Sequence, residues 1–335
     1  MIQVLSGHIE QLDLALDQLA LRDRNFDRFA IMLVDNVVEL VLHQHAQEKN
    51  REEETWRRLQ QPKFNAKTLS AALGQHFDAK MKFALESNLI DKNLANSLNR
   101  LHGFRNSAYH RGLRHEGILH SLAIFYFVNI CSLLQAYSPP YWSSGSSDKI
   151  SHRAVKYLGH SNSLDAFLGA SDRFSDAWKI LKAVAESMSM PLTSDLAQDM
   201  AKTIDSIDTN IEFVVTNSPG KAPTRDKVVL EAQVWTLAFS DAGVAYAKAN
   251  GYKSKPPKGL VTWLTKNYPF TVKRDPIPRW KARQQSLALE DDPHKALEKY
   301  CSFMAQTQEL RAYIEEHALL LDGYIQEQID MARCK

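Results

Sequence analysis

The chain has 335 residues, of which 44% are hydrophobic and 24% charged, so it is long enough to bury a sizeable core. Because 41 Lys and Arg oppose 39 Asp and Glu, the formal net charge of +2 excludes a polycation that binds nucleic acid through overall charge alone. Three widely separated cysteines exclude a disulfide framework and a Cys-based zinc knuckle, and they suit a reducing cytoplasm.

The first part of the chain predicts helices, because apolar residues recur every three or four positions. The first 18 residues carry three acids and no basic region, so we expect a helix there and not a signal peptide. A second helix from about Asp27 to Gln47 has one apolar stripe, while Asp35 and Glu39 lie on its other face. The charged stretch 47–63 predicts a solvated helix end and a loop.

Two further helices are predicted before a strongly apolar one. Residues 66–88 have a helical spacing, and Asp91 is expected to cap the helix that follows. The apolar stretch from Ile118 to Tyr137 is interrupted by five polar side chains, so it falls short of the roughly 18 apolar residues that a membrane span needs. We therefore expect a buried central helix and no membrane partner.

A stretch rich in proline and serine, residues 138–148, cannot continue a helix, and we place a domain boundary there. The following residues again predict helices, at roughly 162–190, 194–217, 226–250 and 293–332. We therefore expect an all-α protein with an N-terminal helical bundle over residues 1–140 and a second helical domain over residues 150–335.

The sharpest local feature is the segment LHGFRNSAYHRG, residues 101–112. Leu94, Leu98 and Leu101 form one stripe of a helix, and the next position on that stripe is Arg105. Burying an unpaired charge is expensive, so Arg105 needs an anionic partner, a hydrated groove or a bound ligand.

Two further side chains of this segment belong with Arg105. Asn106 and His110 are four residues apart, so the amide can orient the imidazole on the same side of the helix. Arg105 and His110 lie roughly 140° apart around the helix and therefore flank a groove. A long Arg side chain can bridge that angle, or two copies of the chain can bring these residues together across a twofold axis.

The Arg-Asn-x-x-x-His motif in a helical bundle of this size resembles the HEPN superfamily, whose active members are metal-independent ribonucleases. The resemblance covers residues 1–140 and makes Arg105 the motif arginine, Asn106 its polar follower and His110 the motif histidine. It implies an endoribonuclease that uses no metal and no cofactor, acting as a toxin or phage-defence effector. The implied partners are RNA, a second copy of the chain as a homodimer, and an antitoxin or sensor protein.

The same resemblance implies supporting residues and a chemistry. The family tends to have an acid on an earlier helix that faces the motif, and Asp35 and Glu39 are the candidates. RNA cleavage without metal needs a general acid, a general base and a cation beside the transition state, which histidine and arginine supply. Attack by the 2'-hydroxyl is expected to leave a 2',3'-cyclic phosphate and a 5'-hydroxyl.

One toxin type of this family continues the motif as His-x-Tyr, with a tyrosine that a partner nucleotidyltransferase modifies. Here Arg111 and Gly112 follow His110, and the nearby tyrosine, Tyr109, precedes it. This departure argues against that mode of regulation and leaves Tyr109 as a supporting residue of the motif.

Other interpretations stay open. The Arg–His spacing recurs at 114–120 and 311–317, and His102 is expected to be a solvated or packed helix residue. The histidines of this region do not have the spacing of a metal site, so we predict none. The alternatives to a ribonuclease are a catalytically inactive HEPN module that acts as a binding scaffold, and a helical nucleic-acid-binding regulator.

The regulator would act through residues 247–285, which hold ten Lys or Arg, one acid and five aromatic residues. Cations beside aromatic rings bind single-stranded RNA. The candidate RNA contacts are Lys253, Lys255, Lys258, Lys273 and Arg274. The rings can instead anchor an irregular loop to neighbouring helices, which is the role that we favour for Trp263 and Trp280.

Overall fold

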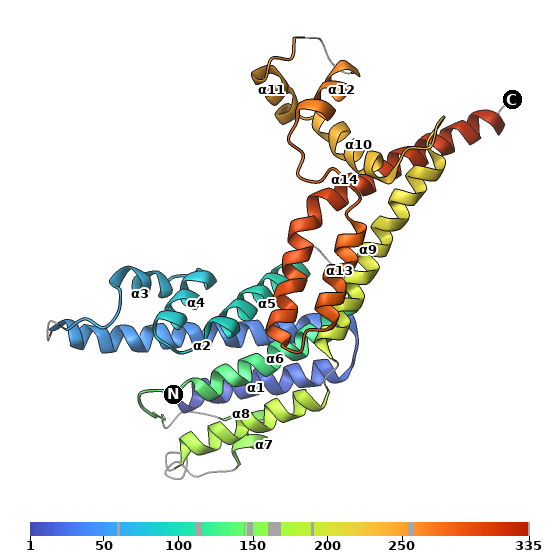
Figure 1. Cartoon of the computed structure of the whole chain (residues 1–335). Helices are drawn as coiled ribbons and strands as arrows, with labels where there is room; N and C mark the ends of the chain where they lie inside the picture. Colours follow the sequence, from blue (N-terminus) through green and yellow to red (C-terminus); the bar gives the residue numbers. More distant parts are fainter. Residues whose placement is uncertain are drawn as a thin grey trace. The chain divides into compact units, whose positions relative to one another are not determined.

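The computed structural model describes residues 1–58, 61–110, 116–143, 145, 150–159, 169–188, 191–253 and 258–333. Over these ranges the chain is helical and has no strand, which confirms the predicted all-α class (Figure 1). The chain forms two compact units, one of residues 1–195 with 291–298 and one of residues 196–290 with 299–335. The stretch 138–148 lies within the first unit, and independent folding of residues 1–140 remains a prediction.

The first unit contains the helices from which the candidate site is built. They are α1 (Ile2–Ala20), α2 (Arg24–Arg58), α3 (Ala66–Ala72), α4 (Phe77–Glu86), α5 (Lys92–His110), the short 3-10 helix η1 (Glu116–Ile118), α6 (Leu119–Ala136), α7 (His152–Leu158) and α8 (Ala170–Ser187). Two further helices, α9 (Leu192–Asn217) and α14 (Pro293–Arg333), begin in this unit and continue into the second.

Helix α6 is the central helix of the first unit and packs against α1, α2, α5 and α8 (Figure 1). Its length and hydropathy would allow it to cross a membrane, but 67% of it is buried inside the protein. That burial is expected of a core helix, because apolar side chains leave water when neighbouring helices cover them.

Three buried acids of α2 hold polar side chains of α6 and of the residue that follows it. The pairs are Asp27 with His120 at 2.7 Å, Asp35 with Tyr126 at 2.6 Å and Glu48 with Tyr137 at 2.6 Å. The residue numbers rise together on both helices, so α2 and α6 run parallel. Because a buried acid without a partner is strongly destabilising, these pairs fix the register of the two helices.

The helix ends differ from the sequence prediction at two places in this unit. Helix α2 continues through the charged stretch after Gln47 as far as Arg58, supported by ion pairs of Lys49 with Glu52 and of Arg57 with Glu53. The single helix expected over 66–88 is divided into α3 and α4, because Leu73 caps α3 and the chain turns through Gly74.

The second unit also corrects two predictions. It contains α10 (Arg225–Ala238), α11 (Asp241–Ala249), α12 (Lys258–Asn267) and α13 (Ile277–Ala288). The helix expected over 226–250 is therefore two helices, since the Ser240 side chain caps α11 by accepting a hydrogen bond from the Gly243 backbone nitrogen. A Cβ on Gly243 would lie 1.9 Å from the Leu237 carbonyl oxygen, so only glycine fits this break. The segment 247–285, expected to be irregular, contributes α12 and most of α13.

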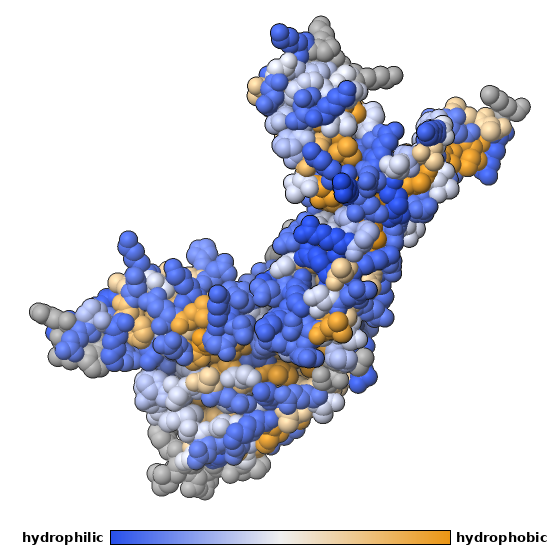
Figure 2. Space-filling model, in the orientation of Figure 1, coloured by the Kyte–Doolittle hydropathy of each residue, from blue (hydrophilic) through white to orange (hydrophobic). Residues whose placement is uncertain are grey.

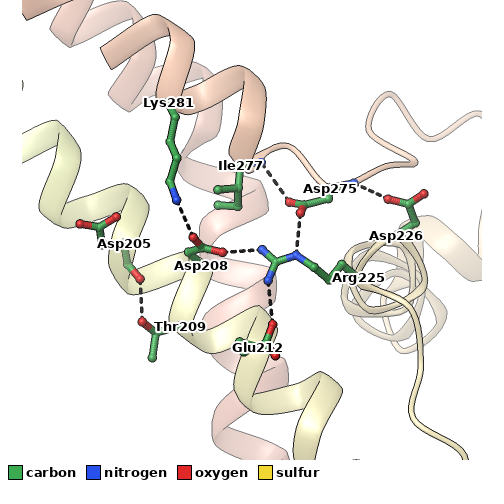
Figure 3. Close-up of polar contacts among 9 residues, drawn as sticks. All are labelled: Asp205, Asp208, Thr209, Glu212, Arg225, Asp226, Asp275, Ile277 and Lys281. Carbon is green, nitrogen blue, oxygen red and sulfur yellow. Dashed lines mark hydrogen bonds and ion pairs between the residues drawn. The ribbon is translucent and has the colours of Figure 1, made fainter. Parts of the chain in front are cut away.

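An ion-pair network centred on Arg225 joins three elements of the second unit (Figure 3). The guanidinium donates to Asp275 at 2.7 Å, to Asp208 at 2.5 Å and to Glu212 at 3.0 Å. Lys281 of α13 donates to the same Asp208 at 2.8 Å. Burial alone would raise the pKa of Asp208, but the hydrogen bonds from Lys281 and Arg225 lower it. The network therefore ties the start of α10 to α9 and α13.

Candidate active site

The candidate site is built around the carboxylate of Asp35, which is fully buried on α2. Its Oδ1 accepts a hydrogen bond from the hydroxyl of Tyr126 on α6 and lies 2.8 Å from Nδ1 of His102 on α5. Its Oδ2 lies 3.3 Å from Nε of Arg105, also on α5. One acid thus gathers a phenol, an imidazole and a guanidinium from two neighbouring helices.

Arg105 occupies the stripe on which Leu98 and Leu101 are buried, as the sequence predicts. The anionic partner of this half-buried guanidinium is Asp35. Its Nη1 also donates to the side-chain oxygen of Asn106 at 2.9 Å, and 33% of the side chain remains exposed. The guanidinium is therefore fixed in orientation while part of it still faces solvent.

His102, which the sequence predicts to be a solvated or packed helix residue, is packed and belongs to the Asp35 cluster. Its ring stacks on Phe77 of α4, with ring centroids 3.9 Å apart and the planes 3° from parallel. Because a carboxylate only accepts hydrogen bonds, Nδ1 of His102 donates to Asp35 and Nε2 is the remaining ring nitrogen. The available signal was the three-residue spacing to Arg105, which puts both side chains on one side of α5.

Of the two candidate acids, Asp35 contacts the motif arginine and Glu39 has another partner. Glu39 lies one helical turn further along α2 and accepts from the ammonium of Lys80 at 3.0 Å. Lys80 is 3% exposed and Glu39 is 37% exposed. This pair borders the Asp35 cluster on the side of α4.

Tyr126 is a further member of the cluster that the sequence analysis missed. Burial raises the pKa of its phenol well above the usual value, and the charge of Asp35 and the hydrogen bond to it raise the pKa further. The phenol therefore keeps its proton and acts as a permanent donor to the carboxylate. Its sequence signal was weak, because one tyrosine in an apolar helix looks like an ordinary core residue.

The motif histidine ends α5, but its side chain, like that of Tyr109, lies outside the described residues. Since α5 and α6 are packed consecutive helices joined by a short connection, α5 runs antiparallel to α6 and hence to α2. The eight residues from His102 to His110, and the eight from Asp35 back to Asp27, each span about 12 Å. The last turn of α5 therefore lies at the level of Asp27.

At that level a second carboxylate and imidazole are paired. Nδ1 of His120 lies 2.7 Å from Oδ1 of Asp27, which is buried in the first turn of α2. The other ring nitrogen of His120 is buried and has no hydrogen-bond partner among the residues that the structure describes. Two acid–imidazole pairs therefore lie along α2, His102 with Asp35 and His120 with Asp27.

The structure describes the side chains of three of the five predicted RNA contacts in the second unit. Lys253, Lys273 and Arg274 are exposed, whereas Lys255 and the side chain of Lys258 lie outside the described residues. Trp263 packs against a core cluster formed by α10, α11 and α12, and Trp280 is buried with its ring edge-on to Phe303. The other three rings, those of Tyr252, Tyr268 and Phe270, belong to the same cluster.

The aromatic rings of the basic segment therefore anchor it, as expected for the two tryptophans. A pair of exposed rings, Trp235 of α10 and Phe239 directly after it, instead borders a cavity of about 1090 Å³ in the second unit, together with Tyr324 of α14. Figure 2 shows hydrophobic residues toward the end of α14.

Among the described residues, no group of three His, Cys, Asp or Glu side chains is arranged to hold a metal ion. No family model, no curated protein and no solved structure matches this chain.

Proposed function

We propose that the helical bundle of residues 1–140 is a metal-independent endoribonuclease of the HEPN type. The observation that carries this proposal is the fixed guanidinium of Arg105, held by Asp35 and Asn106 with a third of its side chain exposed. A preoriented guanidinium that still faces solvent is suited to fork onto phosphate oxygens. The acid on the earlier helix, expected from the family resemblance, supports the same assignment.

In this proposal His110 is the general acid or base, and Arg105 stabilises the negative charge that develops on the phosphate in the transition state. The 2'-hydroxyl attacks the neighbouring phosphorus, the 5'-oxygen leaves with a proton, and a 2',3'-cyclic phosphate forms. Two copies of the chain would supply two histidines and so separate the acid and base roles. The cellular role that we propose is that of a cytoplasmic toxin or phage-defence effector, controlled by an antitoxin or a sensor protein.

The proposal is tested by incubating the full chain with labelled single-stranded RNA in the presence of a metal chelator. We expect cleavage with 2',3'-cyclic phosphate ends, and a loss of about 10²–10³-fold in rate for Arg105→Ala and for His110→Ala. The matched control is Arg100→Ala, since Arg100 lies on the same helix and pairs with Glu298 at 3.3 Å. Cleavage that needs a metal, or that survives Arg105→Ala, would overturn the proposal.

A second candidate is a catalytically inactive binding module, and one observation favours it. The Asp35 cluster is one of three buried acid–donor pairs along α2 and α6, and pairs of this kind also have a purely structural use. Under this candidate, purified protein leaves RNA uncut, and Arg105→Ala lowers stability only.

A further inference from the structure

The outer surface of α1 and α2 carries a stripe of side chains that the core does not use. On each helix six positions recur at intervals of three and four residues, so they share one side of that helix. The twelve positions, here named the neutral face, are Val4, Gly7, Gln11, Leu14, Gln18 and Leu21 from α1 and its C-terminal cap, and Phe26, Phe29, Leu33, Asn36, Leu40 and His43 from α2.

The two stripes form one continuous surface. Helices α1 and α2 pack against each other, and the side-chain amide of Asn36 donates to Gln11 at 2.7 Å on the exposed side of the pair. Every position of the neutral face is at least partly exposed, and large apolar side chains such as Phe29 and Leu40 are 53% and 42% exposed. Exposed apolar surface gathered in this way is the usual mark of an interaction site.

The distribution of charge around the neutral face has the pattern of an interface. None of its twelve residues is an acid, a lysine or an arginine, although 24% of the chain is charged. Charged residues instead line both edges, with Glu10 and Asp17 on α1 and Arg28 and Glu39 on α2. Protein interfaces show the same arrangement, an uncharged centre surrounded by a charged rim.

We propose that the neutral face binds the neutral face of a second copy of this chain. A twofold interface must be complementary to itself, and a face without charge meets its own copy without repulsion. The central amides of Gln11 and Asn36 both donate and accept, so each can pair with its counterpart across the axis. A partner of strong charge would find no opposite charge on this face.

The size of the neutral face is sufficient for a stable dimer. Each stripe covers 18 residues, so the face is about 27 Å long and, with two helix diameters, about 20 Å wide. That footprint of about 540 Å² per copy gives about 1,100 Å² in total, above the roughly 1,000 Å² that a specific interface needs.

This inference deepens the proposed function. The dimer itself does not depend on that function, but the role of the dimer in RNA cleavage rests on it. Asn36, at the centre of the α2 stripe, directly follows Asp35 in the chain, and the Asp35 cluster lies on the neighbouring side of α2. The twofold axis of this dimer would run perpendicular to α2 near Asn36. The two Arg105 side chains would then lie at the same height along α2 and on the same edge of the dimer.

The test measures the mass of the full chain in solution, without RNA, by light scattering after gel filtration at micromolar concentration. We expect a dimer for the unchanged chain, monomers for Asn36→Glu and for Asn36→Lys, whose like charges meet at the axis, and a dimer again when these two variants are mixed. Leu319→Glu is the matched control, because Leu319 is 71% exposed on α14 and should leave the dimer intact. Circular dichroism checks that each variant keeps its helix content.

Rescue in the mixture supports a second copy as the occupant, because only then do opposite charges meet across the face. A monomeric unchanged chain, or an Asn36→Glu variant that stays dimeric, overturns the inference. The RNA assay is separate: a dimer that does not cut RNA removes the proposed function and leaves the dimer face standing.

Discussion

Replacing Asp35 by alanine should destabilise the protein strongly, because three donors lose their partner at once. The substitution removes the acceptor of His102 and Tyr126 and the counter-charge of Arg105, all within 3.3 Å of a fully buried carboxylate. Removing one member of a buried pair typically costs about 3–5 kcal/mol, so we expect the free energy of unfolding to fall by about 4 kcal/mol. Asp35→Asn keeps an acceptor of the same shape and should cost about half as much.

The measurement is urea-induced unfolding at pH 7 followed by circular dichroism. Asp78→Ala serves as the control, since Asp78 is exposed on α4 and its replacement should change stability by less than about 0.5 kcal/mol. Combining Asp35→Ala with Tyr126→Phe should show a coupling energy of about 1–2 kcal/mol, because the two groups share a hydrogen bond. A cost below about 1 kcal/mol for Asp35→Ala, or no coupling to Tyr126, would refute the assignment of Asp35 as the centre of the cluster.

Two further predictions concern stability. Burial lowers the pKa of His8 to about 4, so below pH 6.5 the unfolded chain takes up a proton that the folded chain does not. The contribution of His8 to stability should therefore be fully present above pH 6.5 and fall by about 3 kcal/mol as the pH falls to 4. Burial also lowers the pKa of His45 to about 4, so His8→Gln should make the fall in melting temperature across this range shallower without removing it. A flat profile for the unchanged chain would contradict this. Gly243→Ala should lower the free energy of unfolding by about 3 kcal/mol, because its Cβ would collide with the Leu237 carbonyl oxygen, whereas Gly323→Ala, with open space around it, should be neutral or stabilising. Equal melting temperatures for these two variants would rule out the steric reason.

The sequence indicates where the candidate site lies, but it does not show which residues meet there. The Leu94–Leu98–Leu101 stripe marks Arg105 as a charge in a core position, and the need for an anionic partner follows from the cost of burial. The spacing along the chain could not decide between Asp35 and Glu39. That choice depends on where α5 crosses α2, and on Lys80 of α4, which already holds Glu39.

The two helix breaks could not be predicted from the apolar spacing either. Apolar spacing continues through residues 66–88 and 226–250, so each region predicts one helix. The chain turns within both, after Leu73 in the first and at Ser240 in the second, where the Ser240 cap and the close approach at Gly243 are more favourable than a continued helix. In the basic segment, the rings that the sequence offers as stacking platforms are needed for a small core among α10, α11 and α12.

The sequence by itself determined the all-α class, the central buried helix and the position of the unusual arginine, since helical periodicity and the cost of burying a charge act over one or two turns of chain. Only the tertiary structure decided which acid meets Arg105, that His102 and Tyr126 join it, and that α1 and α2 leave an uncharged surface exposed. These features depend on how helices distant in sequence pack against one another. Packing of that kind depends on the shape and position of every neighbouring side chain, which no local pattern in the sequence specifies.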